Sequence, residues 1–490
     1  MPRIASRLCR LCIALTVSII TLTVLFDLRR ARDFLAVPHS PLFHSRPACP
    51  RSPLLDDILV VVRTGATEVR EKLPVHFQTV LACVPDYVIY SDLEEDIEGH
   101  HVHDVLDQVP DHYRRTAPEF ALYNKLRESG RQGLEYQTSF GSGPTGALDN
   151  PGWKLDKWKF LPMLDRALQH RPHAKWFVFI EPDTYMIWQN VLEYLRRFEP
   201  GEDLYIGTPM YIGEVLFAHG GSGFMVSNIA MRTVLQHWKD NRDWYDQYTA
   251  KEWAGDMVLG RAMKDAHIDL FAAVPHFQGQ SLTGVDWTVN KHDKPTWCYT
   301  PLTFHHMTEP EFHLMWQFEE TWLRRNRGKT SPRFQDVFRN VIQPQLRSRL
   351  DGWDNMATGT EYSDEAFAKL SDDDKLALSE EERRAQVSFE ACQAVCESKP
   401  SCIQFSHAPR KCIISNELRL GHAAESQCLE YSRSAGKCVR TGADGAPDGA
   451  PDKESTVSSG WIMKRVSASL DQMDKACESP ELSGWAHFFG

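Results

Sequence analysis

Two carboxylates stand one residue apart at the end of an apolar segment in the sequence WFVFIEPDTY. Glu181 and Asp183 follow the run 176–180, with Pro182 between them. Side chains at positions i and i+2 beyond a strand can meet in one crevice, where they suit a hard divalent cation that bridges the phosphates of a nucleotide. Proline is tolerated at the exit of a strand, where its missing N–H is not needed. The alternative is an ordinary turn in which Asp183 caps the next helix.

Two further segments carry groups of the same chemical kind. Asp256 in AGDMVLGRAM precedes a predicted helix over 257–266, and a lone carboxylate in a crevice can act as a general base. The alternative role for Asp256 is a helix N-cap. His305 in PLTFHHM ends a strand-like segment. An imidazole beside a carboxylate moves metal preference from Mg²⁺ toward Mn²⁺, although a histidine buried in the core is the competing interpretation.

Glycine and histidine clusters complete the set of polar signals. HGGSGFMVS places glycines at 220, 221 and 223, which lets the backbone approach a ligand closely. Its spacing fits neither a dinucleotide fingerprint nor a P-loop. EGHHVHDVLD groups three histidines with acids. We expect a solvated loop there, because its flanks are acidic and show no strand or helix pattern.

The segments around these residues alternate between strand and helix patterns. Strands are predicted at 58–62, DYVIYSD, 176–180 and DLYIG, and helices at DKWKFLPMLDRALQH, NVLEYLRRF and SNIAMRTVLQHW, the last with Ser227 or Asn228 as N-cap. This order predicts an α/β fold with a mostly parallel sheet. Because ligands bind beyond the carboxyl ends of such strands, residues 63–65, Asp92 and 181–183 should lie at the ligand-binding edge.

The composition points to a membrane-anchored protein of the secretory pathway. The chain has 490 residues, enough for two or three domains, and a net charge of −11 argues against a nucleic-acid partner. The uncharged run 11–26, with arginines on both flanks, predicts a retained signal-anchor, with a cleaved signal peptide as the alternative. Six cysteines lie between Cys392 and Cys438. That density indicates disulfides and hence an oxidising lumen, so we expect a single-pass type II membrane protein.

Seven regions are expected along the chain. Residues 1–10 form a cytosolic tail, 11–26 the transmembrane signal-anchor, 27–55 a stem, 56–345 the main α/β domain, 346–385 a linker, 386–440 a cysteine-rich module, and 441–490 a flexible linker with a C-terminal helix. The linker prediction for 346–385 rests on the acidic, poorly periodic stretch SDDDKLALSEEERR. The C-terminal prediction rests on GWIMKRVSASLDQM, an amphipathic pattern that should dock on the main domain.

The order of these segments resembles glycosyltransferase family 31, with the closest likeness to the core 1 β-1,3-galactosyltransferase and Fringe branch. The likeness spans residues 56–325 and rests on ILVVVRTG, WKLDKWKF, WFVFIEPDTYMI, DLYIGTPMY, HGGSGFMVS, AGDMVLGRAM and CYTPLTFHHM. It implies a GT-A fold, a UDP-sugar donor, Mn²⁺, inversion at the anomeric carbon and a Golgi membrane location with a lumenal catalytic domain. Transfer of galactose in β-1,3 linkage to a glycan or glycoprotein is the first expectation.

The resemblance also assigns roles by position. Asp183 matches the main metal ligand, Glu181 the first acid of the same motif, His305 the histidine ligand and Asp256 the catalytic base. The nucleotide-sugar contacts are expected from Thr64, Gly65, Lys157, Glu181, Asp183, Gly221 and Ser222. Two departures from the family stand out, since the usual three aspartates are Glu-Pro-Asp here and Gly255 replaces the acid before the base.

The cysteine-rich segment FEACQAVCESKPSCIQFSHAPRKCII resembles a PAN/Apple module. Its candidates for disulfides are Cys392, Cys396, Cys402, Cys412, Cys428 and Cys438. Six cysteines allow fifteen pairings, and the sequence selects none of them. Because such modules bind protein or carbohydrate, the competing expectation is a catalytically weak or inactive carbohydrate-binding or scaffold protein that acts through this module. The oligomeric state stays open, with a homodimer as one candidate.

Overall fold

The computed structural model describes residues 47–134, 150–291, 294–424, 431–432, 437–438, 457–478 and 484–485. The elements below belong to one compact unit, Cys49–Gly490. The predicted tail and signal-anchor, residues 1–26, and most of the predicted stem lie outside the described residues. Among the helices that are described, none combines the length and the apolar character needed to cross a membrane.

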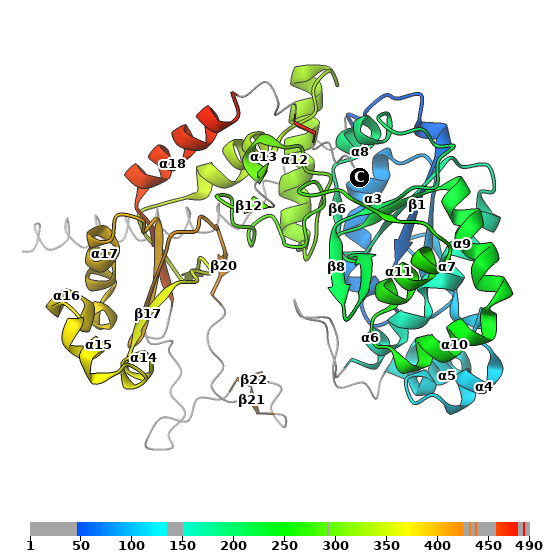
Figure 1. Ribbon diagram of the computed structural model, residues 1–490, viewed down its shortest axis with the longest axis horizontal. Helices are drawn as coiled ribbons and strands as arrows, with labels where there is room; N and C mark the ends of the chain where they lie inside the picture. The colour runs from blue at the N-terminus through cyan, green and yellow to red at the C-terminus, as the bar shows by residue number, and fades with distance from the viewer. Residues whose placement is uncertain are drawn as a thin grey trace, which may run out of the picture. The chain divides into compact units, whose positions relative to one another are not determined.

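An eight-stranded sheet forms the centre of the main domain (Figure 1). Its strands, in the order β11-β7-β10-β5-β1-β2-β4-β3, are β1 (Ile58–Arg63), β2 (Tyr87–Ser91), β3 (Glu95–Ile97), β4 (His100–Asp104), β5 (Trp176–Ile180), β7 (Tyr205–Gly207), β10 (Phe224–Ser227) and β11 (Leu270–Ala272). The central pairs β5–β1, β1–β2 and β2–β4 are parallel, as is β7–β11, whereas β10 is antiparallel to both neighbours and β3 to β4. The α/β fold with a mostly parallel sheet is thus confirmed.

Helices cover both faces of this sheet, which explains why its central strands are apolar throughout. One face, with Leu59 and Val61 of β1, packs on residues of the helices α5 (Phe120–Ser129), α7 (Phe160–His170), α9 (Asn228–Asp240) and α11 (Gly255–Asp265). The other face, with Val60 and Val62, packs on residues of α3 (Pro74–Gln78), α8 (Trp188–Leu195) and α12 (Glu309–Asn326). Figure 1 shows α7, α9 and α11 grouped on one side of the sheet.

Helix starts in the main domain decide the capping alternatives. Ser227 is the N-cap of α9, where its side chain accepts a hydrogen bond from the Ala230 N–H, as one of the two predicted choices requires. Helix α8 has Ile187 as its N-cap, and α11 has Ala254. Neither Asp183 nor Asp256 therefore serves as a helix N-cap.

The histidine-rich segment EGHHVHDVLD is not the loop that the sequence predicts. His100–Asp104 forms strand β4, which pairs in parallel with β2 and antiparallel with β3. Only Val102 in this strand is fully buried. The strand is held by backbone pairing with β2 and β3 rather than by an apolar face, so its hydrophobic pattern is too weak to recognise.

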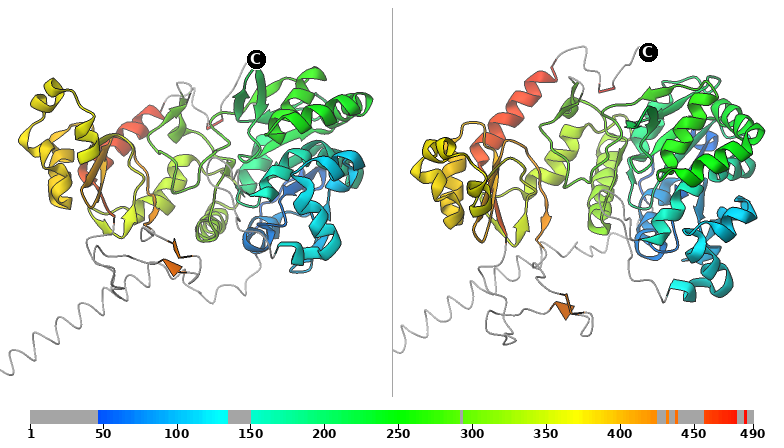
Figure 2. Two further views of the ribbon diagram at one scale, coloured as in Figure 1. Left: turned by 90° about the horizontal axis from the view of Figure 1, so that it is seen from below. Right: turned by 60° about the horizontal axis from the view of Figure 1, so that its bottom comes forward.

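A second, five-stranded antiparallel sheet lies in the C-terminal part of the chain. Its strands, in the order β15-β23-β18-β19-β17, are β15 (Leu350–Asp351), β17 (Thr360–Ser363), β18 (Gln404–Ala408), β19 (Lys411–Ser415) and β23 (Ser458–Trp461). Helix α17 (Phe389–Ser398) packs its buried face on β18 and β19. The helices coloured yellow to orange in Figure 2 lie beside this sheet. Disulfides join Cys392 to Cys412 and Cys396 to Cys402, whereas Cys428 and the side chain of Cys438 lie outside the described residues.

The predicted linker 346–385 is wrong, because β15 and β17 in this range are strands of the second sheet. Its acidic stretch forms α15 (Asp372–Ala377) and α16 (Glu380–Arg383). Each helix begins at a serine, Ser371 or Ser379, whose side chain accepts a hydrogen bond from a backbone N–H of the first turn. Local capping, which needs no apolar periodicity, therefore orders this segment.

The predicted C-terminal helix is confirmed as α18 (Met463–Ala476), and it docks on the main domain. Trp297 Nε1 donates a hydrogen bond to Asp474 Oδ1 (2.9 Å), and a disulfide joins Cys298 to Cys477. A further disulfide, between Cys49 and Cys83, fastens the start of the described chain. Four disulfides in the described residues thus span both parts of the molecule.

Candidate active site

An open pocket of about 260 Å³ lies beyond the carboxyl ends of β1 and β5, beside the first turn of α11. Its wall includes Arg63, Gly65, Lys157, Glu181, Gly221, Asp256, His305 and His306. Residues from six distant parts of the sequence thus meet where a parallel sheet ordinarily binds ligands. Asp183 lies just behind this wall, in contact with His305 and His306.

Strand pairing explains how Asp183 and His305 come together. Strand β6 (Tyr185–Met186) pairs antiparallel with β14 (Thr303–Phe304), with Tyr185 opposite Phe304. This pairing brings Asp183, two residues before β6, close to His305, the residue that follows β14. Asp183 Oδ1 lies 3.3 Å from His305 Nε2, and the Met307 N–H donates to the Asp183 carbonyl oxygen (2.9 Å).

The charges at this junction oppose the effect of burial. Burial alone would raise the pKa of Asp183, but interactions with the imidazoles of His305 and His306 hold that pKa well below its usual range. Burial would lower the pKa of His305, yet Asp183 and Glu181 raise it to about 9. Asp183 and His305 thus each favour the charged form of the other, and a cation that binds here would compete with the proton on the imidazole.

Glu181 is held by a cation of the protein itself. Its Oε1 forms an ion pair with Arg63, which also pairs with Asp156. Despite burial, the Arg63 charge lowers the pKa of Glu181 to about 2. The other oxygen, Oε2, is 3.7 Å from His305 Nε2. Between the two acids, the Pro182 carbonyl oxygen accepts a hydrogen bond from His76 Nε2 (2.9 Å). The backbone at Pro182 therefore has a structural role.

The donor set around Asp183 fits a divalent cation such as Mn²⁺. Ligating atoms of Asp183, His305 and His306 lie within 4.8 Å of one another. Among the described residues, Asp183 Oδ1 and His305 Nδ1 are buried without a hydrogen-bond partner. His306 has a φ of 58°, an uncommon conformation for a residue other than glycine. One carboxylate with two imidazoles is a donor set typical of Mn²⁺ and related ions.

Asp256 occupies the first turn of α11 and faces the same pocket. Its Oδ2 accepts a hydrogen bond from the Gly220 N–H (2.9 Å), and its Oδ1 accepts one from the Met257 N–H (2.9 Å). Burial raises the pKa of Asp256, while the Gly220 hydrogen bond and Arg63 act in the opposite direction. A buried carboxylate with a raised pKa and free lone pairs has the properties of a general base.

The glycine before Asp256 has a steric cause. A Cβ at Gly255 would lie 2.7 Å from Lys157 Cα and 2.8 Å from Phe160 Cε2. Since Lys157 Cα belongs to the backbone, it cannot move aside cheaply. The acidic side chain that the family resemblance leads us to expect at this position would therefore not fit here.

The residues predicted to contact the nucleotide differ in their access to the pocket. Gly65 and Gly221 line the pocket, and Thr64 and Ser222 are buried beside it. Lys157 also lines the pocket, but its Nζ lies 3.0 Å from Glu119 Oε1 and donates to the carbonyl oxygens of Ala250 and Glu252. The ammonium of Lys157 therefore joins three neighbouring segments. These five assignments stay predictions.

A family model described as Fringe-like matches residues 54–308, which contain β1 to β14 and every predicted site residue. The chain belongs to the Fringe-like family. The membership supports a glycosyltransferase. Among solved structures, the apo form of the glycosyltransferase GlyE from Streptococcus pneumoniae TIGR4 is similar, with 12% identity and a TM-score of 0.28 over 56% of this chain and 65% of that one. The chain thus spans less than two thirds of that protein's length.

Several residues of the Fringe-like site were missed from sequence. His306 adds an imidazole, and only its place beside His305 hinted at it. Lys72 Nζ lies 2.9 Å from Asp183 Oδ2 and 3.0 Å from Glu68 Oε2. Lys159, almost fully buried, donates from Nζ to the Thr64 carbonyl oxygen (2.7 Å). The contacts of Lys72 with Asp183 and of Lys159 with Thr64 join segments far apart in the chain, so local sequence gives no signal for them.

We predict that Gly221→Ala damages the Fringe-like site through His305. A Cβ at Gly221 would overlap the His305 ring, which is buried and cannot withdraw. We expect a loss of about 1–3 kcal/mol in the free energy of unfolding, measured by urea denaturation, together with reduced activity. Gly201→Ala is the control, because a Cβ there meets no atom within 4 Å. Equal stability of both variants would contradict this account of His305.

Proposed function

We propose that this chain transfers a hexose, with galactose in β-1,3 linkage as the first candidate, from a UDP-sugar to a glycan or glycoprotein acceptor. The observation that carries the proposal is the position of two adjacent glycines. Gly220 donates its N–H to Asp256, while Gly221 lies against His305. The proposed base and the proposed cation-binding cluster thus contact adjacent residues of one backbone segment in a single pocket.

The reaction proposed is a single displacement with inversion at the anomeric carbon. Asp256 accepts the proton of an acceptor hydroxyl, whose oxygen attacks C1 of the sugar from the face opposite UDP. The C1–O bond to UDP breaks, and the electron pair leaves with the diphosphate. The Gly220 and Met257 N–H groups orient the carboxylate throughout.

The donor is proposed to bind along the edge formed by the ends of β1 and β5. The backbone of Gly65 forms part of the pocket wall. Lys159 stabilises the same loop by donating a hydrogen bond to the Thr64 carbonyl oxygen. Asp92 Oδ1 accepts a hydrogen bond from the Ala66 N–H (2.7 Å), which fixes the same loop. Asp183, His305 and His306 would hold Mn²⁺, with Glu181 near them. When bound, the ion would supply positive charge for the departing diphosphate.

An aromatic surface beside Asp256 is proposed to receive the acceptor. Trp153 and Trp253 both line the pocket and stack with ring centroids 6.1 Å apart. Trp253 is 57% exposed, and Met210 is exposed at the same rim. An exposed indole near a base suits the apolar face of a sugar ring, because its large flat surface gains contact at small entropic cost.

Trp253→Ala is predicted to weaken acceptor binding selectively. Loss of one stacking contact should raise the KM for the acceptor about two- to tenfold and leave donor hydrolysis unchanged. Trp244→Ala is the matched control, since Trp244 is an exposed tryptophan on α10 (Arg242–Lys251) that stacks on Tyr248 outside the pocket wall. Parallel losses in donor and acceptor kinetics would contradict the acceptor assignment.

The proposed function is tested by UDP release from UDP-galactose, UDP-N-acetylglucosamine and UDP-glucose, each with and without Mn²⁺. Mn²⁺-dependent turnover of one donor is the expected result, with calorimetry showing Mn²⁺-dependent binding of UDP. No turnover and no Mn²⁺-dependent UDP binding would overturn the proposal. That outcome would favour the binding or scaffold protein that acts through the PAN/Apple-like module.

The cellular setting belongs to the same proposal. We infer a single-pass type II protein of the Golgi membrane, anchored by residues 11–26, with the pocket in the lumen. The four disulfides support an oxidising compartment. The partners proposed are the UDP-sugar, the acceptor and a protein or carbohydrate ligand of the PAN/Apple-like module, whereas a nucleic acid is not expected for a chain of net charge −11.

A further inference from the structure

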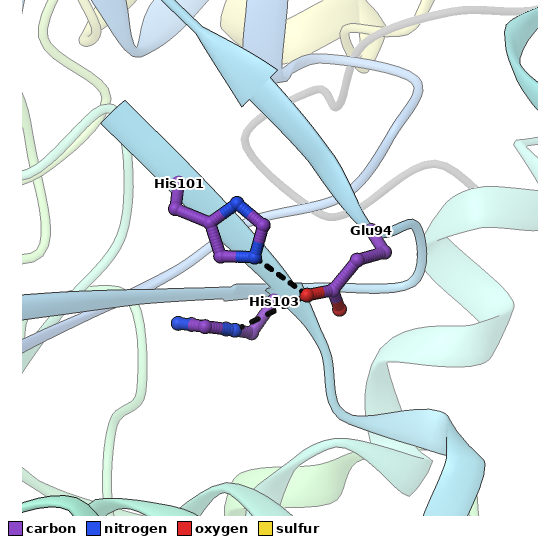
Figure 3. Close-up of side chains that lie close together, drawn as sticks. All are labelled: Glu94, His101 and His103. Atoms are coloured by element: carbon purple, nitrogen blue, oxygen red, sulfur yellow. Dashed lines mark hydrogen bonds and ion pairs between the residues drawn. The ribbon is translucent and has the colours of Figure 1, made fainter. Parts of the chain in front are cut away.

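Three ligating side chains converge at the outer edge of the main sheet, on the β3–β4 hairpin (Figure 3). His101 Nε2 lies 2.6 Å from Glu94 Oε1, and His103 Nδ1 lies 3.3 Å from the same oxygen. Their ligating atoms all lie within 4.8 Å of one another. His101 and His103 are two residues apart in β4, so strand geometry places both imidazoles on one face.

The surrounding groups hold these side chains in position. The Asp104 N–H donates to Glu94 Oε2 (2.6 Å), which leaves Oε1 directed at the two imidazoles. His101 Nδ1 lies 2.9 Å from Asp96 Oδ1, and these two residues are paired opposite each other in the hairpin. A carboxylate on the second ring nitrogen is the arrangement that fixes the orientation of a metal-binding histidine and raises its basicity.

The cluster is open to solvent on its remaining side. Glu94 and His101 are exposed, and His103 is half-buried. Glu94 and His103 also line an open cavity of about 460 Å³, shared with Asp104 and His170. A metal ion held by three protein ligands here has room for a water molecule as its fourth ligand, as in open four-coordinate zinc sites.

We propose that Glu94, the residue before β3, forms with His101 and His103 of β4 a Zn²⁺-type metal site that joins the start of β3 to β4. Two imidazoles and one carboxylate are a donor set that zinc binds in tetrahedral geometry. The site differs from the Asp183 cluster in position and in burial, and it does not depend on the proposed transferase activity.

A structural role follows from the place of the hairpin. Among the described strands, β3 is the outermost strand of the sheet on this side. The next residue, Glu95, binds Arg131 Nη1 (2.7 Å), and Arg131 Nη2 donates to the carbonyl oxygen of Ala66 in the loop after β1 (2.8 Å). A metal that joins β3 to β4 would therefore stabilise an edge that supports the pocket loop.

The test is a Co²⁺ and Zn²⁺ titration of the full chain carrying Asp183→Ala, which removes a ligand of the other cluster. We expect one Co²⁺ per chain with the visible absorption of tetrahedral cobalt, displaced by Zn²⁺, and a higher Tm with Zn²⁺. His101→Ala or His103→Ala should remove the absorption, and Asp96→Asn should weaken binding about tenfold. His112→Ala, an exposed histidine on α4 (Asp111–Thr116), is the control and should bind as the parent does.

Glu94→Gln distinguishes the loss of a metal ligand from misfolding, because it keeps the size of the side chain while removing its charge. It should retain the circular dichroism spectrum and lose most of the Zn²⁺ affinity. Unchanged Co²⁺ binding in His101→Ala and His103→Ala, or no tetrahedral absorption in the parent, would overturn the proposal.

Discussion

Replacing Asp256 by asparagine is expected to abolish sugar transfer and leave UDP binding intact. The amide has almost the same shape as the carboxylate and can still accept a hydrogen bond from the Gly220 or Met257 N–H. It cannot take a proton from the acceptor hydroxyl. Loss of a general base costs about 10²- to 10⁴-fold in rate, so kcat should fall in this range, measured by UDP release, while calorimetry shows unchanged UDP affinity.

A second aspartate on the same helix provides the control for this prediction. Asp265 ends α11 and binds Arg261 Nε (2.8 Å) outside the pocket. Asp265→Asn removes a charge from α11 without touching the site, so kcat should be unchanged. A fully active Asp256→Asn enzyme would exclude Asp256 as the base. Loss of UDP binding in the same variant would instead assign Asp256 to the donor.

The parts of the fold that could be predicted from sequence are those held by the burial of apolar side chains. Strands β1 and β5 are buried on both faces, so their segments ILVVV and WFVFI are continuous apolar runs. Strand β4 is different, because its side chains are mostly polar and it is held by backbone pairing. Strand β17 is also mostly polar, and in the described part of the chain its one partner strand is β19. Single-sequence patterns detect burial well and backbone pairing poorly.

The same division holds in the candidate site. Asp183, Asp256 and His305 could be proposed from residue type and order along the chain. The sequence places Arg63 at the ligand-binding edge but does not reveal its partner, since only the pairing of β1 with β5 brings Glu181 beside it. Lys72 is 111 residues from Asp183 in sequence. The cations that neutralise Glu181 and Asp183 are brought to them by the tertiary fold, so the spacing of residues along the sequence does not predict these pairs.

Replacing Asp183 by alanine is expected to remove both Mn²⁺-dependent UDP binding and sugar transfer. Asp183 is the only carboxylate among the three ligating residues of the buried cluster, and the pKa of His305 is raised by it and by Glu181. Without it, two imidazoles remain beside Lys72, a set that attracts a divalent cation weakly. We expect at least a 100-fold loss of Mn²⁺ affinity, measured by calorimetry and by electron paramagnetic resonance of free Mn²⁺.

Glu181→Gln separates the two acids of the Glu-Pro-Asp motif. Arg63 already neutralises the Glu181 carboxylate. Removing the Glu181 charge should therefore change Mn²⁺ affinity much less than removing Asp183. The fold should survive Asp183→Ala, since Lys72 keeps Glu68 as a partner at 3.0 Å, and Asp183→Asn gives an isosteric second variant. Mn²⁺ affinity that falls equally in Glu181→Gln and Asp183→Ala would show that both acids hold the ion. Unchanged affinity in Asp183→Ala would place the ion elsewhere and leave the Asp183 cluster as a purely structural ion pair.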